Sequence, residues 1–403
     1  MATPTQDSIR TSNSTLVRFK AIRTSIFGCL LLLLVGCFAG NEQIHYELAS
    51  TTLPMRPAWE YVAKSRLWSP AVIYDDAIAL VYDGAVVHAI DIETGSVQWE
   101  WENPRPDKAG SVEFGNSFKL SDKGVLFVPG ERGQLYALEA NTGRELWEFS
   151  AYEYFNRAFP TQINVTYLDM DRDHLFVEFL NADDRRFYVV ALDPDDGRGL
   201  WQAEGNIVIL VVTDDALIGA SGYDLLSLDK DTGAVIKRQI RTPPIAPAET
   251  YLGTVAIIID EEDKIVASSL LDNRRVWEFD PGCRTIKDIV ARGEDQERRT
   301  VYVATGCGTL YKLDGGTGEP LWTYQDSVSP LNVAANGEHV FVLRSDIALL
   351  QLNALDGEVI GIQTMTPPYP YLSGGFPSAL AVSDSHLLML LGRQLFGYEL
   401  EAQ

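Results

Sequence analysis

Residues 133–147 read GQLYALEANTGRELW, and this stretch decides the fold. The letters LYAL place apolar side chains on a strand of the kind that is buried on both faces. The letters NTG form a turn, because Asn bonds its own backbone and Gly143 can adopt a positive φ. The following strand ends in Trp147, whose ring buries roughly 150–250 Å². The stretch predicts a strand–turn–strand unit in which small Ala137 leaves room for a large ring from an adjacent unit.

The same pattern is found in seven copies along the chain. The tryptophan or its replacement stands at positions 99, 147, 201, 237, 277, 322 and 361, at steps of 36 to 54 residues. Lys237 and Gly361 replace the tryptophan, and the copies at 223–237, 265–277 and 349–361 depart most from the pattern. A further apolar strand precedes most copies. Periods of this length, with four strands each, are typical of β-propeller blades.

An eighth unit is divided between the two ends of the chain. Residues 386–390 and 393–399 supply two of its strands, and Ala58-Trp59-Glu60-Tyr61 supplies the strand with the tryptophan. Pairing the first strand with the last closes the ring and leaves no free edge. We therefore expect an all-β, eight-bladed propeller of four-stranded antiparallel blades over residues 57–403, closed by pairing of the N- and C-terminal strands.

Residues 1–36 are typical of an export signal. Basic residues precede an apolar run at 26–35, which is too short to span a bilayer because a span needs roughly 20 residues. Leu34-Val35-Gly36-Cys37 resembles a bacterial lipobox, in which the cysteine is lipidated and becomes the new N-terminus. The alternative is an ordinary signal peptide in which Cys37 is incidental. Residues 37–56 are polar and aperiodic, so we expect a lipidated cysteine followed by a flexible tether.

Charge and cysteine content limit the partners and the compartment. The chain holds 33 Lys and Arg against 56 Asp and Glu, a net charge of −23, which should repel nucleic acid. Once Cys37 is lipidated, Cys283 and Cys307 are the two thiols of the mature chain, and an exported chain meets an oxidising compartment. Both lie on connections that emerge on one face of the sixth blade, so we expect a disulfide between them. The alternative is two unpaired cysteines with separate packing roles.

The repeated copies resemble the PQQ-like repeat family across residues 57–403, and this resemblance implies an eight-bladed propeller. The family includes quinoprotein dehydrogenases, for which the resemblance would imply an adjacent Cys-Cys pair, a catalytic Asp and a Ca²⁺ ion held by Glu and Asn. The four cysteines, at 29, 37, 283 and 307, include no adjacent pair, and the Cys-x-x-Cys-His haem signature is absent. We therefore expect no enzymatic activity, no catalytic residues and no cofactor.

One acidic segment imitates a calcium loop. Residues 169–173 read DMDRD, but His174 occupies the glycine position of such a loop and Leu180 the position of the bidentate acid. A solvated hairpin between the first two of the four strands of a blade, named A to D in chain order, explains the segment better. Three of the five histidines begin B strands in register, which is a structural position, so no metal site is expected.

Size, lipid anchor and repeats together resemble the BamB lipoproteins of the outer-membrane β-barrel assembly machine. The resemblance implies a monomeric propeller that binds a protein partner of this machinery through loops of one face, at the periplasmic face of the outer membrane in a Gram-negative host. Another exported binding role and a PQQ-dependent dehydrogenase are the alternatives. The predicted contacts are apolar and aromatic residues on the face that the D–A and B–C loops form: Tyr152, Tyr154, Phe155, Pro243, Pro244, Ile245, Tyr369 and Tyr371. Alternatively, these side chains close over the channel or pack between blades.

Overall fold

The computed structural model describes residues 47–67, 71–105, 118–155, 163–181, 185–203, 205–222, 224–240, 250–252, 254–260, 262–270, 274–293, 299–366 and 378–400. All of them belong to one compact unit, His45–Gln403, and a second unit comprises Met1–Ile44. No helix in the described ranges is both long and apolar enough to cross a bilayer. The predicted export signal and Cys37 lie outside the described residues.

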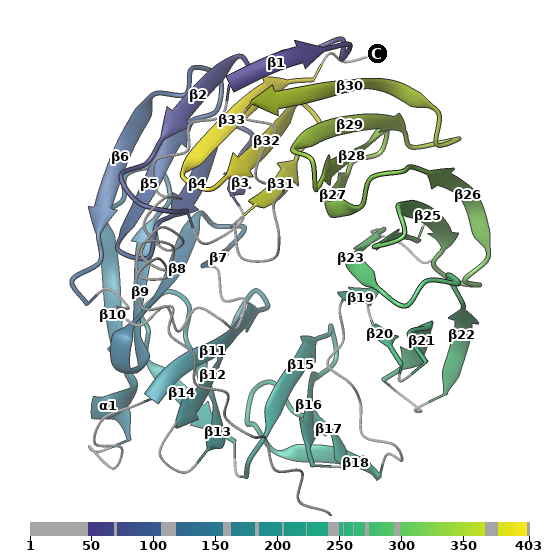
Figure 1. Cartoon of the computed structure of the whole chain (residues 1–403). Coiled ribbons are helices and arrows are strands. Elements are labelled where there is room, and N and C mark those ends of the chain that lie inside the picture. Colours follow the sequence, from purple (N-terminus) through teal and green to yellow (C-terminus); the bar gives the residue numbers. More distant parts are fainter. Residues whose placement is uncertain are drawn as a thin grey trace, which may run out of the picture. The chain divides into compact units, whose positions relative to one another are not determined.

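Eight antiparallel sheets make up the unit, and each sheet is one propeller blade (Figure 1). We name the strands of a blade A to D, from the centre outward. Blade 1 consists of β3 (Val72–Tyr74), β4 (Ile78–Tyr82), β5 (Val86–Asp91) and β6 (Val97–Glu102). Blade 2 consists of β7 (Lys119–Leu120), β8 (Val125–Gly130), β9 (Gln134–Glu139) and β10 (Glu145–Ser150). Blade 3 consists of β11 (Ile163–Met170), β12 (Leu175–Asn181), β13 (Arg186–Leu192) and β14 (Gly199–Gln202). Blades 4 to 6 consist of β15 (Val208–Val212), β16 (Leu217–Ser221), β17 (Asp224–Leu228) and β18 (Val235–Ile240); β19 (Thr250–Leu252), β20 (Val255–Ile259), β21 (Ile265–Ser269) and β22 (Arg275–Phe279); and β23 (Ile286–Arg292), β24 (Thr300–Thr305), β25 (Thr309–Asp314) and β26 (Pro320–Gln325).

The last two blades include the N-terminal strands. Blade 7 consists of β27 (Pro330–Ala335), β28 (His339–Arg344), β29 (Ala348–Asn353) and β30 (Val359–Thr366), with β1 (Glu47–Thr51) added outside. Blade 8 consists of β31 (Ser378–Val382), β32 (His386–Leu391) and β33 (Gln394–Glu399), and β2 (Trp59–Val62) is its D strand. Figure 1 shows β2 beside β33 and β1 beside β30. The predicted eight-bladed propeller and its closure by terminal strands are confirmed.

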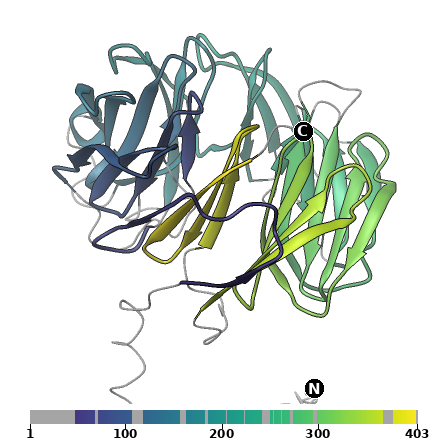
Figure 2. The same ribbon diagram turned by 90° about the horizontal axis from the view of Figure 1, so that it is seen from above.

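The strands run between two loop-bearing faces, which the rotated view of Figure 2 shows from another side. The A–B and C–D turns emerge on one face, called here the A–B face. The B–C turns and the D–A connections emerge on the other, called here the D–A face. Two short helical segments lie at the D–A ends of strands: α1 (Ala151–Tyr154) after β10, and the 3-10 turn η3 (Glu131–Gly133) between β8 and β9.

In most blades, a tryptophan near the start of the D strand packs on the C–D turn of the next blade. We call this contact the clasp. In blade 2, the indole of Trp147 covers Gly197 in the C–D turn of blade 3, where an added Cβ would come within 2.5 Å of the ring. Its Nε1 donates to the carbonyl oxygen of Pro194, three residues before that glycine, at 3.1 Å. The same arrangement of tryptophan, glycine and carbonyl joins other blades: Trp59, Gly95 and Ile92; Trp99, Gly143 and Ala140; Trp201, Gly233 and Lys230; Trp277, Gly318 and Gly315; Trp322, Gly357 and Ala354.

This geometry corrects the sequence-based expectation for the small residue of strand C. Ala137 lies opposite Trp147 of its own blade, and the residue that receives the ring in the next blade is the turn glycine. A register shift between Glu145 and Trp147 leaves the intervening residue in a β-bulge, a device that re-aims a side chain. The repeat pattern revealed the residues of the clasp but not the bulge that directs the ring.

The apolar core lies between neighbouring blades. The cluster between blades 2 and 3 combines four buried aromatic residues, Phe127, Trp147, Phe149 and Phe179, with apolar residues of β9, β12 and β13. Among the described residues, the cluster between blades 4 and 5 contains no aromatic side chain; it comprises Val211, Ala216, Ile218, Leu225, Ala256 and Leu270. The contact between blades 4 and 5 is therefore the least aromatic of those described.

The expectation of a flexible tether over residues 37–56 is wrong for the last part of that range. Residues 47–51 form β1, and Leu53 and Met55 are buried beyond it. A Cβ on Gly361, at the tryptophan position of blade 7, would lie 2.7 Å from the carbonyl oxygen of Thr52. The N-terminal segment thus covers the place that an indole occupies in other blades. The polar composition of these residues gave no sign of this strand, because an edge strand pairs through its backbone and needs no apolar pattern.

Candidate interface and polar sites

The predicted contacts between blades 2 and 3 lie in and directly after α1. The ring centroids of Tyr154 and Phe149 are 5.4 Å apart, and those of Phe155 and Tyr188 are also 5.4 Å apart. Both Tyr154 and Phe155 pack against the apolar cluster between blades 2 and 3, and burial raises the pKa of Tyr154. The structure therefore uses these two side chains for packing between blades, which was the alternative interpretation.

Tyr152 is partly exposed on the same turn and remains a predicted contact. The other predicted contacts, Pro243, Pro244, Ile245, Tyr369 and Tyr371, lie outside the described residues, as does Cys37. A protein-binding surface built from the D–A connections therefore stays a prediction.

A disulfide joins Cys283 and Cys307 on the D–A face, as predicted. Their Cα atoms are 6.1 Å apart and 24 residues separate them in the sequence. The bond ties the connection after β22 to the B–C hairpin of blade 6. The amide of Gly306 donates to Thr285 within the same contact, and Gln325 Nε2 donates to the carbonyl oxygen of Cys307 at 3.1 Å. The disulfide therefore rigidifies this sector of the D–A face.

A buried polar cluster lies where blade 8 meets blade 1. His88 Nδ1 lies 2.9 Å from the Tyr61 hydroxyl and 2.9 Å from Glu100 Oε1, and its Nε2 is 3.6 Å from Asp83 Oδ2. Burial opposes ionisation of Asp83, but nearby His88 and hydrogen bonds from two backbone amides outweigh it and lower the pKa of Asp83 to about 2. Burial, together with the charges of Glu100 and Asp83, raises the pKa of Tyr61 to about 12. The cluster holds the closing strand β2 against blade 1.

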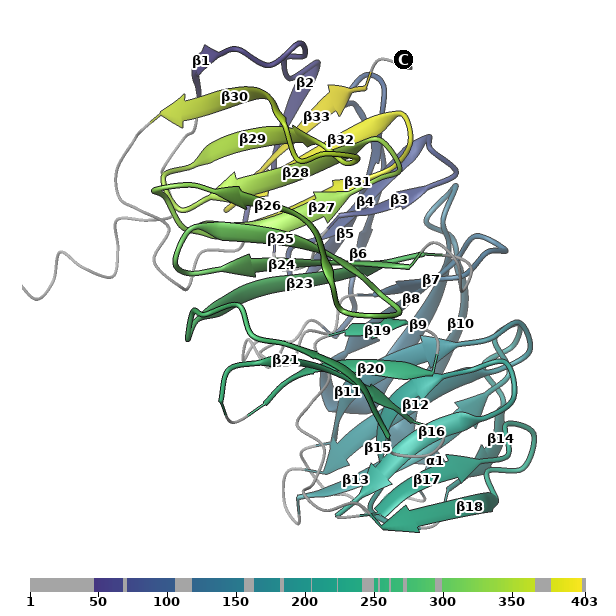
Figure 3. The same ribbon diagram turned by 90° about the vertical axis from the view of Figure 1, so that its right-hand side faces the viewer.

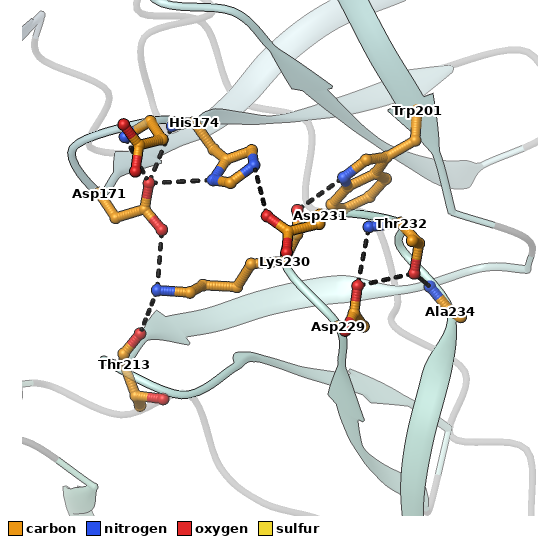
Figure 4. A network of polar contacts seen from close by, with 10 residues as sticks. Asp171, His174, Trp201, Thr213, Asp229, Lys230, Asp231, Thr232 and Ala234 are labelled. Atoms are coloured by element: carbon orange, nitrogen blue, oxygen red, sulfur yellow. Dashed lines mark hydrogen bonds and ion pairs between the residues drawn. The ribbon is translucent and has the colours of Figure 1, made fainter.

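On the A–B face, the acidic segment that imitates a calcium loop is an inter-blade contact (Figure 4). Asp171 accepts a hydrogen bond from the amide of His174 and pairs with Lys230 Nζ of the next blade at 2.8 Å. His174 Nε2 lies 3.3 Å from Asp231 of that blade. Burial opposes ionisation of Asp171, but Lys230 and the nearby amides lower its pKa. The segment is less solvated than expected, and no group of three metal-binding side chains is found among the described residues.

A serine, a histidine and an aspartate meet where the A–B turns of blades 8 and 1 touch. Ser385 Oγ lies 2.7 Å from His386 Nδ1, and Asp76 Oδ1 lies 3.3 Å from the same nitrogen. A hydrolase triad needs the serine on one imidazole nitrogen and the carboxylate on the other. Because Ser385 and Asp76 share one nitrogen here, the set cannot relay a proton to activate the serine. The sequence signal for this contact was the histidine that begins strand B in register.

A cavity of about 260 Å³ opens between blades 2 and 3 on the A–B face. Its charged lining combines three basic residues, Lys119, Lys123 and Arg172, with three acidic residues. Lys119 is already paired with Asp169 at 2.7 Å, and Lys123 with Asp195 at 3.0 Å. A quinone that carries several carboxylates needs free cations and a flat stacking surface. Two of the three cations are paired and the lining contains no aromatic residue, so this cavity is a poor fit for such a cofactor.

Comparison with known proteins places this architecture in a family. A family described as "Outer membrane protein assembly factor BamB" matches residues 83–256 and 248–370. An uncharacterized protein of Rickettsia prowazekii (strain Madrid E) is 21% identical over 301 residues, 74% of this chain and 62% of that protein. Quinohemoprotein alcohol dehydrogenase of Comamonas testosteroni is 32% identical over 102 residues, 24% of this chain and 14% of the enzyme. Outer membrane protein assembly factor BamB of Yersinia pestis is 29% identical over 152 residues, 38% of this chain and 34% of that protein.

The chain spans less than two thirds of each of these curated relatives. Among solved structures, BamB from Moraxella catarrhalis superimposes with a TM-score of 0.56 at 15% identity, over 86% of this chain and all of that chain. That likeness concerns the fold alone. The family match covers most of the propeller, and the repeats, the tryptophan clasps and the ring closure agree with it. The chain therefore belongs to the family of PQQ-like repeat β-propellers that is described as outer membrane protein assembly factor BamB.

Proposed function

We propose that the protein is a membrane-anchored, extracytoplasmic scaffold that takes part in assembling outer-membrane β-barrel proteins and catalyses no reaction itself. The observation that carries this proposal is the family match over residues 83–256 and 248–370. The lipobox-like Leu34-Val35-Gly36-Cys37 supports an anchor, and the net charge of −23 makes a nucleic-acid partner unfavourable.

The polar sites favour a scaffold over an enzyme. The contacts of His88, Asp171 and His386 each join one blade to the next. A rigid ring with loops on both faces is well suited to holding a partner, because loops on a rigid scaffold commonly carry binding residues. A quinoprotein dehydrogenase is the competing activity, and the sequence lacks the adjacent cysteine pair that the resemblance would require.

The partner is tested by affinity isolation of the full-length lipidated protein from detergent-solubilised envelopes of its host. We expect the barrel-inserting subunit of the assembly machinery to be recovered at a stoichiometric level. A Tyr369→Ala, Tyr371→Ala variant tests the predicted contacts. It should lose the partner if those contacts are right, and an unchanged melting temperature is the control that the fold is intact. Recovery of no assembly subunit with the wild type would contradict the proposed role.

Two further measurements test the anchor and the absence of catalysis. Mass spectrometry of the membrane fraction should show a diacylglyceryl cysteine at position 37, and Cys37→Ser should leave the protein in the soluble extracytoplasmic fraction. Addition of PQQ and Ca²⁺ to the purified protein should produce no alcohol or sugar dehydrogenase activity. Turnover under those conditions would overturn the scaffold proposal in favour of the enzyme.

A further inference from the structure

The fifth strand of blade 7 fixes the point at which the N-terminal chain leaves the propeller. β1 pairs antiparallel with β30, so that Glu47 lies opposite Thr366 and Thr51 lies opposite Gln363. β30 begins after the C–D turn and ends at Thr366, where the D–A connection starts. Figure 3 shows β1 alongside β30 at the edge of the blade. The chain that precedes Glu47 therefore emerges at the D–A end of the blade.

Several contacts hold this segment in place. Ser50 Oγ and Thr364 Oγ1 are 2.7 Å apart, and the amide of Thr52 donates to the carbonyl oxygen of Ile362 at 2.8 Å. Leu53 and Met55 are 7% and 9% exposed, so apolar burial follows the strand directly. Because Gly361 has no side chain, the backbone at Thr52 can lie against β30. The exit point of the chain is therefore part of the propeller and not the middle of a free tether.

The length of chain between the anchor and this exit point is short. Ten peptide units separate Cys37 from Glu47, which gives a fully extended reach of about 33–36 Å. The A–B face lies farther from the exit point by the length of a blade strand, about 20 Å for six residues. A bilayer-bound Cys37 can therefore hold the D–A end of blade 7 at the membrane surface at any extension of this segment, whereas the A–B end can face the membrane only when about 20 Å of the reach is used to span the blade.

We infer that the anchored protein presents the D–A face of blade 7 to the lipid headgroup surface and its A–B face to the aqueous compartment, an inference that rests on the lipid anchor of the proposed function. The short attachment at one end of an edge strand acts as an orienting device in addition to an anchor. Loops of the D–A face, including the sector braced by the disulfide of Cys283 and Cys307, then lie on the membrane side of the propeller. A membrane-embedded partner would meet this face first.

The orientation is measured with the lipidated full-length protein reconstituted in vesicles of phosphatidylethanolamine and phosphatidylglycerol that contain an acceptor-labelled lipid. One donor dye is placed at Ser327→Cys, on the exposed D–A connection before blade 7, and in a separate sample at Leu355→Cys, in its C–D turn. The native cysteines do not compete for the dye, because Cys37 is lipidated under the proposal and Cys283 is bonded to Cys307. We expect clearly higher energy transfer from position 327 than from position 355.

The matched control lengthens the tether and leaves the propeller unchanged. An insertion of about twenty Gly and Ser residues after Gly40 makes a flexible coil, and the difference between the two positions should then shrink toward zero. Equal transfer from both positions with the natural tether, or higher transfer from position 355, would overturn the orientation. A wild-type protein that does not sediment with the vesicles would instead refute the anchor, so the failures of the two proposals are distinguishable.

Discussion

The clasp between Trp147 and Gly197 can be tested by replacing the glycine with alanine. Gly197 has φ +72°, a conformation that costs a residue with a side chain about 1–2 kcal/mol. In addition, the new Cβ would lie 2.5 Å from the indole of Trp147, so the ring must move away from the turn. That movement breaks the hydrogen bond to Pro194, worth about 0.5–1.5 kcal/mol. We expect Gly197→Ala to lower the free energy of unfolding by about 3 kcal/mol in total.

Gly222 provides the matched control, because it isolates the backbone contribution. It has φ +59°, but an added Cβ there would meet nothing within 4 Å. Gly222→Ala should therefore cost only the backbone strain, about 1–2 kcal/mol. The difference between the two glycine variants measures the steric contribution of the indole.

A double-mutant cycle with Trp147→Ala completes the test. The single Trp147→Ala change should cost about 3–5 kcal/mol, because it removes a large buried ring. With the ring gone, Gly197→Ala should cost only its backbone strain, which leaves a coupling energy of about 1–2 kcal/mol. Urea titrations followed by far-ultraviolet circular dichroism give all four free energies. Additive effects of the two substitutions, or equal costs at Gly197 and Gly222, would refute the clasp.

Three further outcomes are expected. Replacing both Cys283 and Cys307 with Ala should lower the unfolding free energy by on the order of 3 kcal/mol, because the disulfide closes a loop across 24 positions; non-reducing thiol counts on the wild type should show no free thiol at either site. The carboxyl of Asp83 has its pKa lowered to about 2 in the folded protein, from an ordinary 3.8. Its ionised form therefore stabilises the fold above about pH 4, and that stability is lost as the pH falls through about 2; in acid titrations, Asp83→Asn should make unfolding less dependent on pH over this interval. Gly361→Ala should expose residues 47–55 to limited proteolysis, because its Cβ would lie 2.7 Å from Thr52, whereas Gly337→Ala, with nothing within 4 Å, should not.

The repeat made the blades predictable, because each copy carries its own strand and turn signals. The position of Trp59, far from the other copies, was enough to predict that β2 pairs with β33. The strand at 47–51 was not predictable in the same way. Its pairing uses backbone groups, and its polar side chains carry no periodic apolar pattern.

The candidate sites were less predictable than the blades. Cys283 and Cys307 could be paired from blade topology, because both connections had to emerge on the same face. The role of Tyr154 could not be decided from the sequence, since an aromatic residue in a connecting loop can either face a partner or pack on its own blade. The cluster at His88 was missed because its members come from β2, β5, β6 and the turn at Asp83, which are close only after the ring closes.

The two copies that lack a tryptophan show that the tryptophan of one blade and the turn glycine of the next occur together. Blade 7 has Gly361 in place of the tryptophan, and the next blade, blade 8, has no continuous C–D turn that could receive an indole. Blade 4 has Lys237 in place of the tryptophan. In the sequence of the next blade, Asn273 stands four residues before Trp277, at the position that holds the turn glycine in other copies; Asn273 lies outside the described residues. A tryptophan is thus missing only where the next blade has no turn glycine to accept it.

This pairing predicts how a clasp can be restored between blades 4 and 5, where the described core contains no aromatic residue. Lys237→Trp alone should gain little, because position 273 holds no glycine to accept the ring, and Asn273→Gly alone should gain nothing, because it adds only backbone freedom. The two changes together should raise the free energy of unfolding by about 2 kcal/mol, through burial of the indole and its new hydrogen bond. Urea titrations of the two single variants and the double variant decide the matter. A double variant no more stable than the better single variant would show that the tryptophan and the glycine are separate preferences of each blade and not one contact.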